Sequence, residues 1–290
     1  MGESAARAEV RVEARAKVNL FLRVLGRRDD GYHDLESLVV PVSLSDTVIV
    51  RADAELSFGM RPAGSIQFEP IDPRRNLAFL AAEDWVETRW TAGEAAEVIV
   101  EKRIPVAAGL GGGSADAAAV LRGMNEVWGE PFGPEELATM GARIGSDVPA
   151  LLDGGAVVMR GRGEIVEPAT VAQMWWVLVP QPFPVSTADV YRWWDEDGGP
   201  TGPNAAPLLE AAAVGDVDAL AGLVFNDLQG PVFRRHPELE EVRSDLLRAG
   251  ALRAILCGSG PTVAGLARDE AHARAVAARI PSAIAVSGPG

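Results

Sequence analysis

The stretch IPVAAGLGGGSADAAA, residues 104–119, decides how this chain folds and what it binds. A strand-like run, residues 98–101, precedes it, and the small-residue run 115–127 predicts a helix after it. Glycines let a backbone turn sharply and bring its N–H groups close to a ligand. The first turn of a helix adds a partial positive charge. We therefore predict an anion-binding loop that suits a phosphate chain.

Three other interpretations of this loop are possible in principle. A dinucleotide-binding turn requires G-x-G-x-x-G in a first βαβ unit, but Ser114 stands at the sixth position and several antiparallel-type strands come earlier. A P-loop requires a lysine after its last glycine, and no lysine follows Lys102. A purely structural turn stays open, although consecutive glycines cost about 0.5–1 kcal/mol each relative to alanine.

Composition restricts the class of protein. The 290 residues are 48% hydrophobic and 23% charged, which is typical of a globular chain with a sizeable core. The net charge of −14 disfavours nucleic acid as a partner. One cysteine, an N-terminus without the apolar core of a signal peptide, and the absence of roughly 18 consecutive apolar residues predict a cytoplasmic protein that does not enter membranes. The oligomeric state stays open.

Basic residues are unevenly divided between the two types. Of the 27 basic residues only Lys17 and Lys102 are lysines, and the others are arginines. A lysine in such a background suggests a need for its compact ammonium, which a planar guanidinium does not imitate. Chance is the alternative explanation.

Strands and helices mix without a regular βαβ rhythm, which predicts an α+β fold. Short runs rich in β-branched residues predict strands at 10–14, 18–25, 38–42, 47–51, 98–101, 175–179, 253–256, 262–266 and 283–286, and a hairpin at 154–167. Helical spacing or helix-start signals predict helices at 76–89, 115–127, 134–142, 187–194, 205–214, 217–225, 238–248 and 269–279. Residues 168–173 resemble an interdomain connection, so we predict domains at 1–167 and 168–290.

Several motifs together resemble the GHMP kinases, named for galactokinase and the homoserine, mevalonate and phosphomevalonate kinases. The loop at Pro105–Ala115 resembles their phosphate-binding loop. ARAKVNLFL at 14–22, DGYHDLES at 30–37, IGSDVP at 144–149, NDL at 226–228 and CGSGP at 257–261 match in order and spacing from about Ala14 to the end. The resemblance implies a two-domain α+β fold with ATP bound to an N-terminal domain and the active site in the interdomain cleft.

The segments around Lys17 and Tyr32 narrow the implied substrate. They resemble the branch that phosphorylates the 2-hydroxyl of 4-diphosphocytidyl-2-C-methyl-D-erythritol with ATP and Mg²⁺ in the non-mevalonate isoprenoid pathway. The alternatives are a GHMP kinase for another small alcohol, such as homoserine or a mevalonate derivative, and a non-catalytic nucleotide-binding relative.

The resemblance assigns two catalytic residues. Asp147 matches the family's base, although an aspartate in a turn is more often structural. Lys17 is expected to keep Asp147 ionised and to stabilise charge on the γ-phosphoryl group. Alternation in the strand around it puts Lys17, Asn19 and Phe21 on one face.

Substrate contacts are also implied by the resemblance. Asn19, Tyr32 and His33 are expected to bind the cytidylated substrate, with His33 at the cytosine edge, although an arbitrary histidine there would be a surface turn residue. Tyr191 matches an aromatic that stacks on cytosine, and core packing within its helix is an equal alternative. For Arg27 and Arg28, steering of an anionic substrate and a plain surface charge are both open.

The expected ATP site comprises the loop and one asparagine outside it. Asn76 is expected near adenine, although it is also an ordinary helix N-cap, and Ser114 is the candidate Mg²⁺ ligand, with Asp116 a weaker one. Residues 258–260 form either a plain turn or a second phosphate-facing loop. The loop residues expected to contact ATP are Pro105, Val106, Ala107, Ala108, Gly109, Leu110, Gly111, Gly112, Gly113, Ser114 and Ala115.

Overall fold

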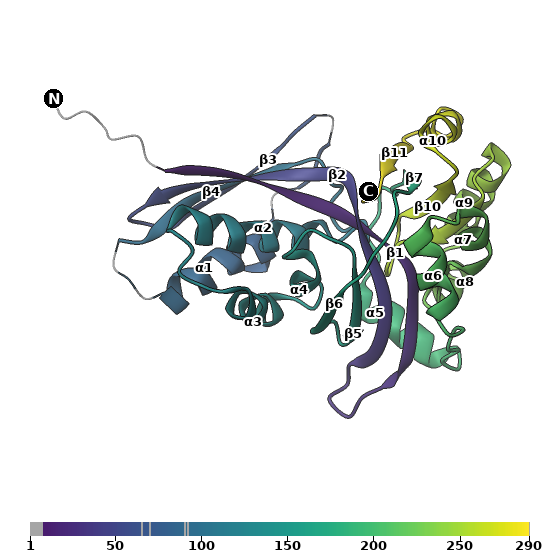
Figure 1. Cartoon of the computed structure of the whole chain (residues 1–290), viewed down its shortest axis with the longest axis horizontal. Helices are drawn as coiled ribbons and strands as arrows, with labels where there is room; N and C mark the ends of the chain where they lie inside the picture. Colours follow the sequence, from purple (N-terminus) through teal and green to yellow (C-terminus); the bar gives the residue numbers. More distant parts are fainter. Residues whose placement is uncertain (1–7, 65, 70, 90, 92, 290) are drawn as a thin grey trace. The chain divides into compact units, whose positions relative to one another are not determined.

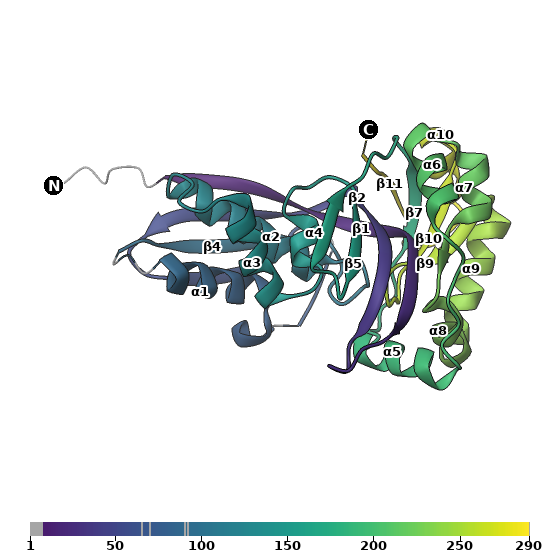
Figure 2. The same cartoon turned by 60° about the horizontal axis from the view of Figure 1, so that its bottom comes forward.

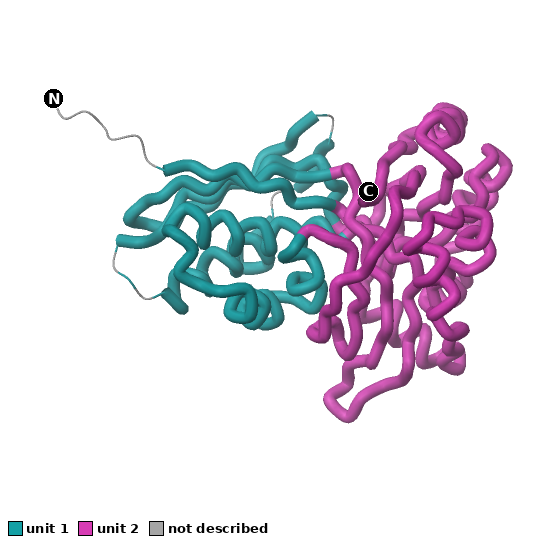
Figure 3. Tube along the Cα trace, viewed as in Figure 1, with its two compact units in different colours: residues 1–15, 45–106, 111–153 teal, residues 16–44, 107–110, 154–290 magenta. Residues whose placement is uncertain are grey.

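The computed structural model describes residues 8–289 apart from residues 65, 70, 90 and 92. It confirms the predicted α+β class. The chain forms two compact units, which Figure 3 colours separately. Unit 1 holds the residues up to Arg15, Ser45–Val106 and Gly111–Asp153, and unit 2 holds Ala16–Leu44, Ala107–Leu110 and Gly154–Gly290. The domain boundary between residues 167 and 168 stays a prediction.

Two long strands contribute to both units. β1 spans Glu9–Arg27 and β2 spans His33–Asp53, where the sequence predicted four shorter strands. The first part of β1 alternates, with Val12 and Ala14 buried and the intervening charged residues exposed. From Ala16 to Leu22 every residue is buried, so this part of the strand is covered on both faces.

Unit 1 is a sheet with helices packed on it. β4 (Ala95–Lys102) pairs antiparallel with β2 and parallel with β3 (Ser57–Pro62). Figure 1 shows the helices below these strands. Small residues let α2 lie close to the sheet, since a Cβ on Gly123 would be 2.7 Å from a methyl of Val50. The helices are α1 (Leu77–Arg89), α2 (Gly112–Val127), α3 (Pro134–Ile144) and α4 (Val148–Leu151), with a short 3₁₀ turn at Pro73–Arg75.

Unit 2 contains a four-stranded antiparallel sheet in the order β11-β7-β10-β9. Helices α9 and α10 pack on it, as Figure 2 shows. In the hairpin β5–β6, β5 pairs antiparallel with β2, and the short β8 pairs parallel with β1. The strands are β5 (Val157–Gly161), β6 (Ile165–Pro168), β7 (Trp175–Val179), β8 (Phe225–Asn226), β9 (Arg253–Leu256), β10 (Val263–Ala267) and β11 (Ile284–Ser287).

The helices of unit 2 are α5 (Thr187–Glu196), α6 (Ala206–Val214), α7 (Val217–Leu223), α8 (Gln229–Arg235), α9 (Pro237–Ala249) and α10 (Glu270–Ala277). The buried faces of α5, α8, α9 and α10 build one core with β7, β9 and β10, which includes Trp194, Leu239 and Leu246. Within the described residues, none of the helices is both long and apolar enough to cross a lipid bilayer.

Candidate active site

The glycine loop lies where the sequence predicts it, between β4 and α2. Gly111 is the N-cap of α2 and has a left-handed backbone with φ of 70°. The amide groups of the next residues therefore form the exposed N-terminal end of a helix, where backbone donors have no intrahelical partner. Backbone amides placed in this way can donate to an anion, and binding of phosphates there stays a prediction.

Gly109 is fixed by its surroundings in unit 2. A Cβ at this position would lie 2.5 Å from the carbonyl oxygens of Cys257 and Gly260, and φ is +77°. The loop is also hydrogen-bonded here, because the carbonyl oxygen of Ala108 accepts from the amide of Thr262 at 3.1 Å. The turn at residues 258–260, singled out from sequence, thus packs directly on the glycine loop.

Lys17 begins a buried chain of polar side chains. Its Nζ donates to Asn19 Oδ1 at 2.8 Å, and Asn19 Nδ2 donates to Ser37 Oγ at 2.8 Å. The Ser37 hydroxyl in turn donates to the carbonyl of Phe21 at 2.6 Å. The amide of Lys17 donates to the loop carbonyl of Leu110 at 2.9 Å, which ties β1 to the loop.

Burial makes this polar chain informative. Lys17 is 5% exposed and Asn19 is 2% exposed. A buried ammonium is costly unless it is hydrogen-bonded, and it is then held in one position. Sequence reasoning assigned no role to Ser37, which the structure adds to the group.

Asp147 lies in unit 1, in the turn before α4. It precedes Val148 with φ of −86° and ψ of −11°, and its side chain makes no capping hydrogen bond to its own helix. The capping role that usually explains an aspartate in such a position is therefore not the one it has here. Because Lys17 belongs to unit 2 and Asp147 to unit 1, their meeting stays a prediction.

His33 and Tyr191 are brought together within unit 2. Their rings stack with centroids 4.9 Å apart, and Trp194 meets the imidazole edge-on at 5.6 Å. His33 Nε2 lies 2.9 Å from Asp195 Oδ1, and its side chain is only 8% exposed. The histidine is thus held on three sides, unlike a surface turn residue. Sequence reasoning did not single out Asp195.

Tyr32 is placed differently from its neighbour. It is 54% exposed, and the guanidinium of Arg162 lies over its ring at 4.6 Å. Tyr32 therefore offers an accessible aromatic ring at the end of the β1–β2 hairpin.

Arg28, in the same hairpin, pairs with Asp34 at 2.8 Å, so part of its charge is neutralised locally.

Asn76 acts as a helix cap. Its Oδ1 accepts a hydrogen bond from the amide of Ala78 at 2.9 Å, and its Nδ2 approaches the sulfur of Met60 at 3.7 Å. This is the N-cap arrangement that the sequence left open as an alternative. Contact with adenine stays a prediction.

The second lysine, Lys102, lies in a buried ionic cluster at the two ends of the glycine loop. Lys102 Nζ donates to Asp116 Oδ2 at 2.6 Å and to Asp46, and all three side chains are buried. Asp46 also accepts from the amides of Arg103 and Ile104, where the chain leaves β4. One buried cluster thus joins the entry to the loop with the first turns of α2.

The charges in this cluster do not balance, because one ammonium faces two carboxylates. Burial raises the pKa of Asp116 to about 8, opposed by the charge of Lys102 and reinforced by that of Asp46. The pKa of Lys102 is raised by the two carboxylates against the opposing effect of burial. Asp116 is thus bound to Lys102 through Oδ2, and a role as a metal ligand stays a prediction.

Family comparisons agree with this geometry. The model for the GHMP kinases N terminal domain matches residues 76–155, which include the loop and Asp147, and the model for the GHMP kinases C terminal matches residues 208–285. The chain belongs to the GHMP kinases, and it is a small-molecule kinase that uses ATP.

Individual relatives narrow the class. A 4-diphosphocytidyl-2-C-methyl-D-erythritol kinase of Symbiobacterium thermophilum is 42% identical over 89% of this chain and 90% of its own length. The protein of the same name from Alkaliphilus metalliredigens is 38% identical over 92% of this chain and 90% of its own. A crystal structure of 4-(cytidine 5'-diphospho)-2C-methyl-D-erythritol kinase has a TM-score of 0.79 at 35% identity, covering 97% of this chain and all of that one. Within the GHMP kinases, the chain belongs to this family.

A more distant structure supports the fold alone. Homoserine kinase from Cytophaga hutchinsonii superimposes with a TM-score of 0.73 at 17% identity, and the alignment covers 100% of this chain and 97% of the other. This similarity shows that the two chains share a fold.

Proposed function

We propose that this chain transfers the γ-phosphoryl group of ATP to the 2-hydroxyl of 4-diphosphocytidyl-2-C-methyl-D-erythritol, giving the 2-phosphate and ADP in the non-mevalonate isoprenoid pathway. The observation that carries the choice of substrate is the stacked pair His33 and Tyr191. Such a site suits a nucleobase, which has a π face and a hydrogen-bonding edge. Homoserine and mevalonate derivatives have no base and do not require it.

Lys17 supplies positive charge at the reacting phosphoryl group in this proposal. Phosphoryl transfer depends mainly on positioning and on stabilising the charge of the transferred group. The bond to Asn19 Oδ1 orients the ammonium without neutralising it, because an amide oxygen carries no net charge. Asn19 thus aims the ammonium and also provides an amide next to the acceptor.

Asp147 accepts the proton of the 2-hydroxyl. That hydroxyl is tertiary and weakly acidic, so its attack on phosphorus benefits from a positioned base. The carboxylate is half-buried and lies in the turn before α4, within the residues that the N-terminal family model matches.

ATP would lie with its phosphates at the amides of Gly111 to Ala115. Gly109 and Gly112 permit the close packing of the loop, since a Cβ on either one would overlap its neighbours. Asn76, through its place at the start of α1, is proposed to adjoin the adenine. The cluster of Lys102 holds both ends of the loop.

Mg²⁺ fits the chemistry of the site. It prefers oxygen ligands and commonly reaches a kinase with nucleotide phosphates and water rather than in an all-protein cage. Among the described residues, no group of three or more His, Cys, Asp or Glu side chains could hold a metal. We propose that the half-buried hydroxyl of Ser114 is a protein ligand, and that the bound ion would offset negative charge on the phosphates.

An acceptor panel tests the proposed substrate. ADP release would be measured with Mg-ATP and, separately, the cytidylated methylerythritol, homoserine and mevalonate. We expect the cytidylated alcohol to be preferred in kcat/KM by at least about 10⁴. Faster turnover of either other alcohol would replace the proposed substrate, and ATP binding without turnover of any alcohol would indicate a non-catalytic relative.

A further inference from the structure

The contact between His33 and Asp195 fixes where the imidazole carries its proton. Asp195 Oδ1 lies 2.9 Å from Nε2, at the hydrogen-bonding distance. An ionised carboxylate only accepts hydrogen bonds, so Nε2 must be the donor. In the neutral ring the remaining nitrogen, Nδ1, is then an acceptor.

Aromatic packing opposes a 180° rotation of the imidazole about its Cβ–Cγ bond, which would swap the positions of Nδ1 and Nε2. Tyr191 stacks on one face with an interplanar angle of 24°, and Trp194 meets the ring at 88°. The imidazole makes its polar contact through Nε2, with Asp195 Oδ1. Arg27 is a further charged group near this pair: its Nη1 lies 3.9 Å from Asp195 Oδ2, and its side chain is largely exposed.

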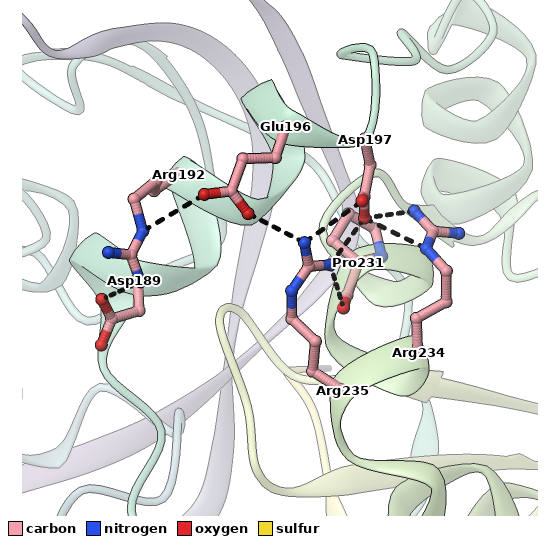
Figure 4. A network of polar contacts seen from close by, with 7 residues as sticks. All are labelled: Asp189, Arg192, Glu196, Asp197, Pro231, Arg234 and Arg235. Carbon is pink, nitrogen blue, oxygen red and sulfur yellow. Dashed lines mark hydrogen bonds and ion pairs between the residues drawn. The ribbon is translucent and has the colours of Figure 1, made fainter.

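The helix that carries Asp195 is itself fastened. The next two residues, Glu196 and Asp197, bind Arg235 of α8 at 3.0 and 2.8 Å, and Asp197 also binds Arg234 (Figure 4). Charge-assisted contacts with several partners at one helix end restrict its movement. The carboxylate therefore reaches His33 from a fixed position.

We propose that Asp195 is a positioning residue that determines base specificity: through His33 it presents a hydrogen-bond acceptor, Nδ1, which selects an amino-bearing pyrimidine over a keto-bearing one. Cytosine offers an amino donor at its position 4, whereas uracil offers an acceptor there. An acceptor facing an acceptor leaves both groups unpaired, which sites of this kind reject strongly. This inference rests on the proposed function, in which His33 contacts the base.

The test compares matched substrates on the full-length enzyme. We would measure kcat/KM for the cytidylated methylerythritol and its uridylated counterpart in the wild type, in Asp195→Asn and in Asp189→Asn. Asparagine has the same shape as aspartate, and its amide can either accept from or donate to Nε2. Both neutral tautomers of His33 therefore become available in this variant. Asp189 is an exposed carboxylate on the same helix that pairs with Arg192, and its variant is the matched control.

We expect the ratio of the two kcat/KM values to fall about tenfold or more in Asp195→Asn, chiefly through KM, and to stay at the wild-type value in Asp189→Asn. An unchanged ratio in Asp195→Asn would overturn the proposal. Equal use of both nucleotides by the wild type would do the same while leaving the kinase activity intact.

A second readout does not need a substrate. Carbon and nitrogen chemical shifts of the imidazole report its tautomer, and the chain has only three histidines to assign. The proposal predicts the Nε2–H form of His33 in the wild type and a mixture in Asp195→Asn. An Nδ1–H ring in the wild type would contradict it, whether or not the proposed substrate is turned over.

Discussion

At the scale of single residues, the chemistry depends on Lys17 and Asp147. We expect Lys17→Ala and Asp147→Asn each to lower kcat by about 10²–10⁴ while the KM values change little, because both groups act mainly in the transition state. Lys17→Arg should also fall well below the wild-type kcat, since a planar guanidinium cannot replace a compact ammonium held by Asn19. Steady-state kinetics under saturating ATP would measure this.

The control for these variants is Asp153→Asn, which makes the same chemical change at an exposed position of unit 1. It should keep the wild-type kcat. Retained turnover in both Lys17→Ala and Asp147→Asn would remove the proposed roles.

Gly109 allows a second test at the scale of one residue. Gly109→Ala would add a Cβ 2.5 Å from two carbonyl oxygens at a φ of +77°, whereas Gly154→Ala would add one at +68° with nothing within 4 Å. Both variants carry the cost of a left-handed backbone, about 1–2 kcal/mol. The clash should cost Gly109→Ala a further 1–3 kcal/mol, roughly.

Urea unfolding of the two glycine variants would measure the difference. Equal losses of stability would mean that the loop shifts to accept the methyl group, and that its close packing on residues 257–260 is not a constraint.

At the scale of elements, β4, the loop and α2 are joined by the cluster around Lys102. The pKa of Asp116 is raised by burial from 3.8 to about 8, so the folded chain holds this proton more tightly than the unfolded chain. The stability that this group contributes is complete below pH 3.8 and is lost as the pH rises through about 8. Asp116→Asn keeps the shape of the side chain and cannot titrate. The loss of unfolding free energy over this pH range should therefore be smaller in the variant than in the wild type, by more than about 1 kcal/mol.

Urea unfolding across that pH window, with Asp153→Asn as the exposed control, would check this. A stability profile for Asp116→Asn that runs parallel to the wild type would show that Asp116 stays ionised in the fold.

Elements differ in how far the sequence predicts them. Strong local signals, such as the glycine loop or the proline and glutamates opening α3, give the correct element. The long strands β1 and β2 were predicted as four pieces, because charged residues interrupt the apolar pattern where one face is exposed. β3, α4 and α8 were missed, and residues 217–225 were predicted as one helix although β8 begins at Phe225. Pairing with β1, a long-range contact, decides that last case.

The candidate site shows the same division. The two lysines stood out in an arginine-rich chain, and both prove to be buried and hydrogen-bonded. Asp46 and Asp195 carried no local signal, because their partners lie 56 and 162 positions away. Only the folded chain reveals what such carboxylates contact.

At the scale of the whole molecule, β1 and β2 link the stability of the two units. β1 gives Val12 and Ala14 to unit 1, and Leu20, Leu22 and Val24 to unit 2. Breaking either strand removes core residues from both, so we expect one cooperative unfolding transition.

Hydrogen exchange with mass spectrometry across a denaturant series would follow peptides from each unit. Coincident loss of protection is the predicted result. Loss of protection in unit 1 at a clearly lower denaturant concentration than in unit 2 would show that each unit is stable without the other.

Identification of the product tests the central claim most directly. The enzyme would be incubated with Mg-ATP and 4-diphosphocytidyl-2-C-methyl-D-erythritol, and the product examined by mass spectrometry and phosphorus NMR. We predict stoichiometric ADP and one new phosphate monoester on the 2-hydroxyl. Unconsumed ATP, or a phosphate attached to any other hydroxyl, would contradict the account.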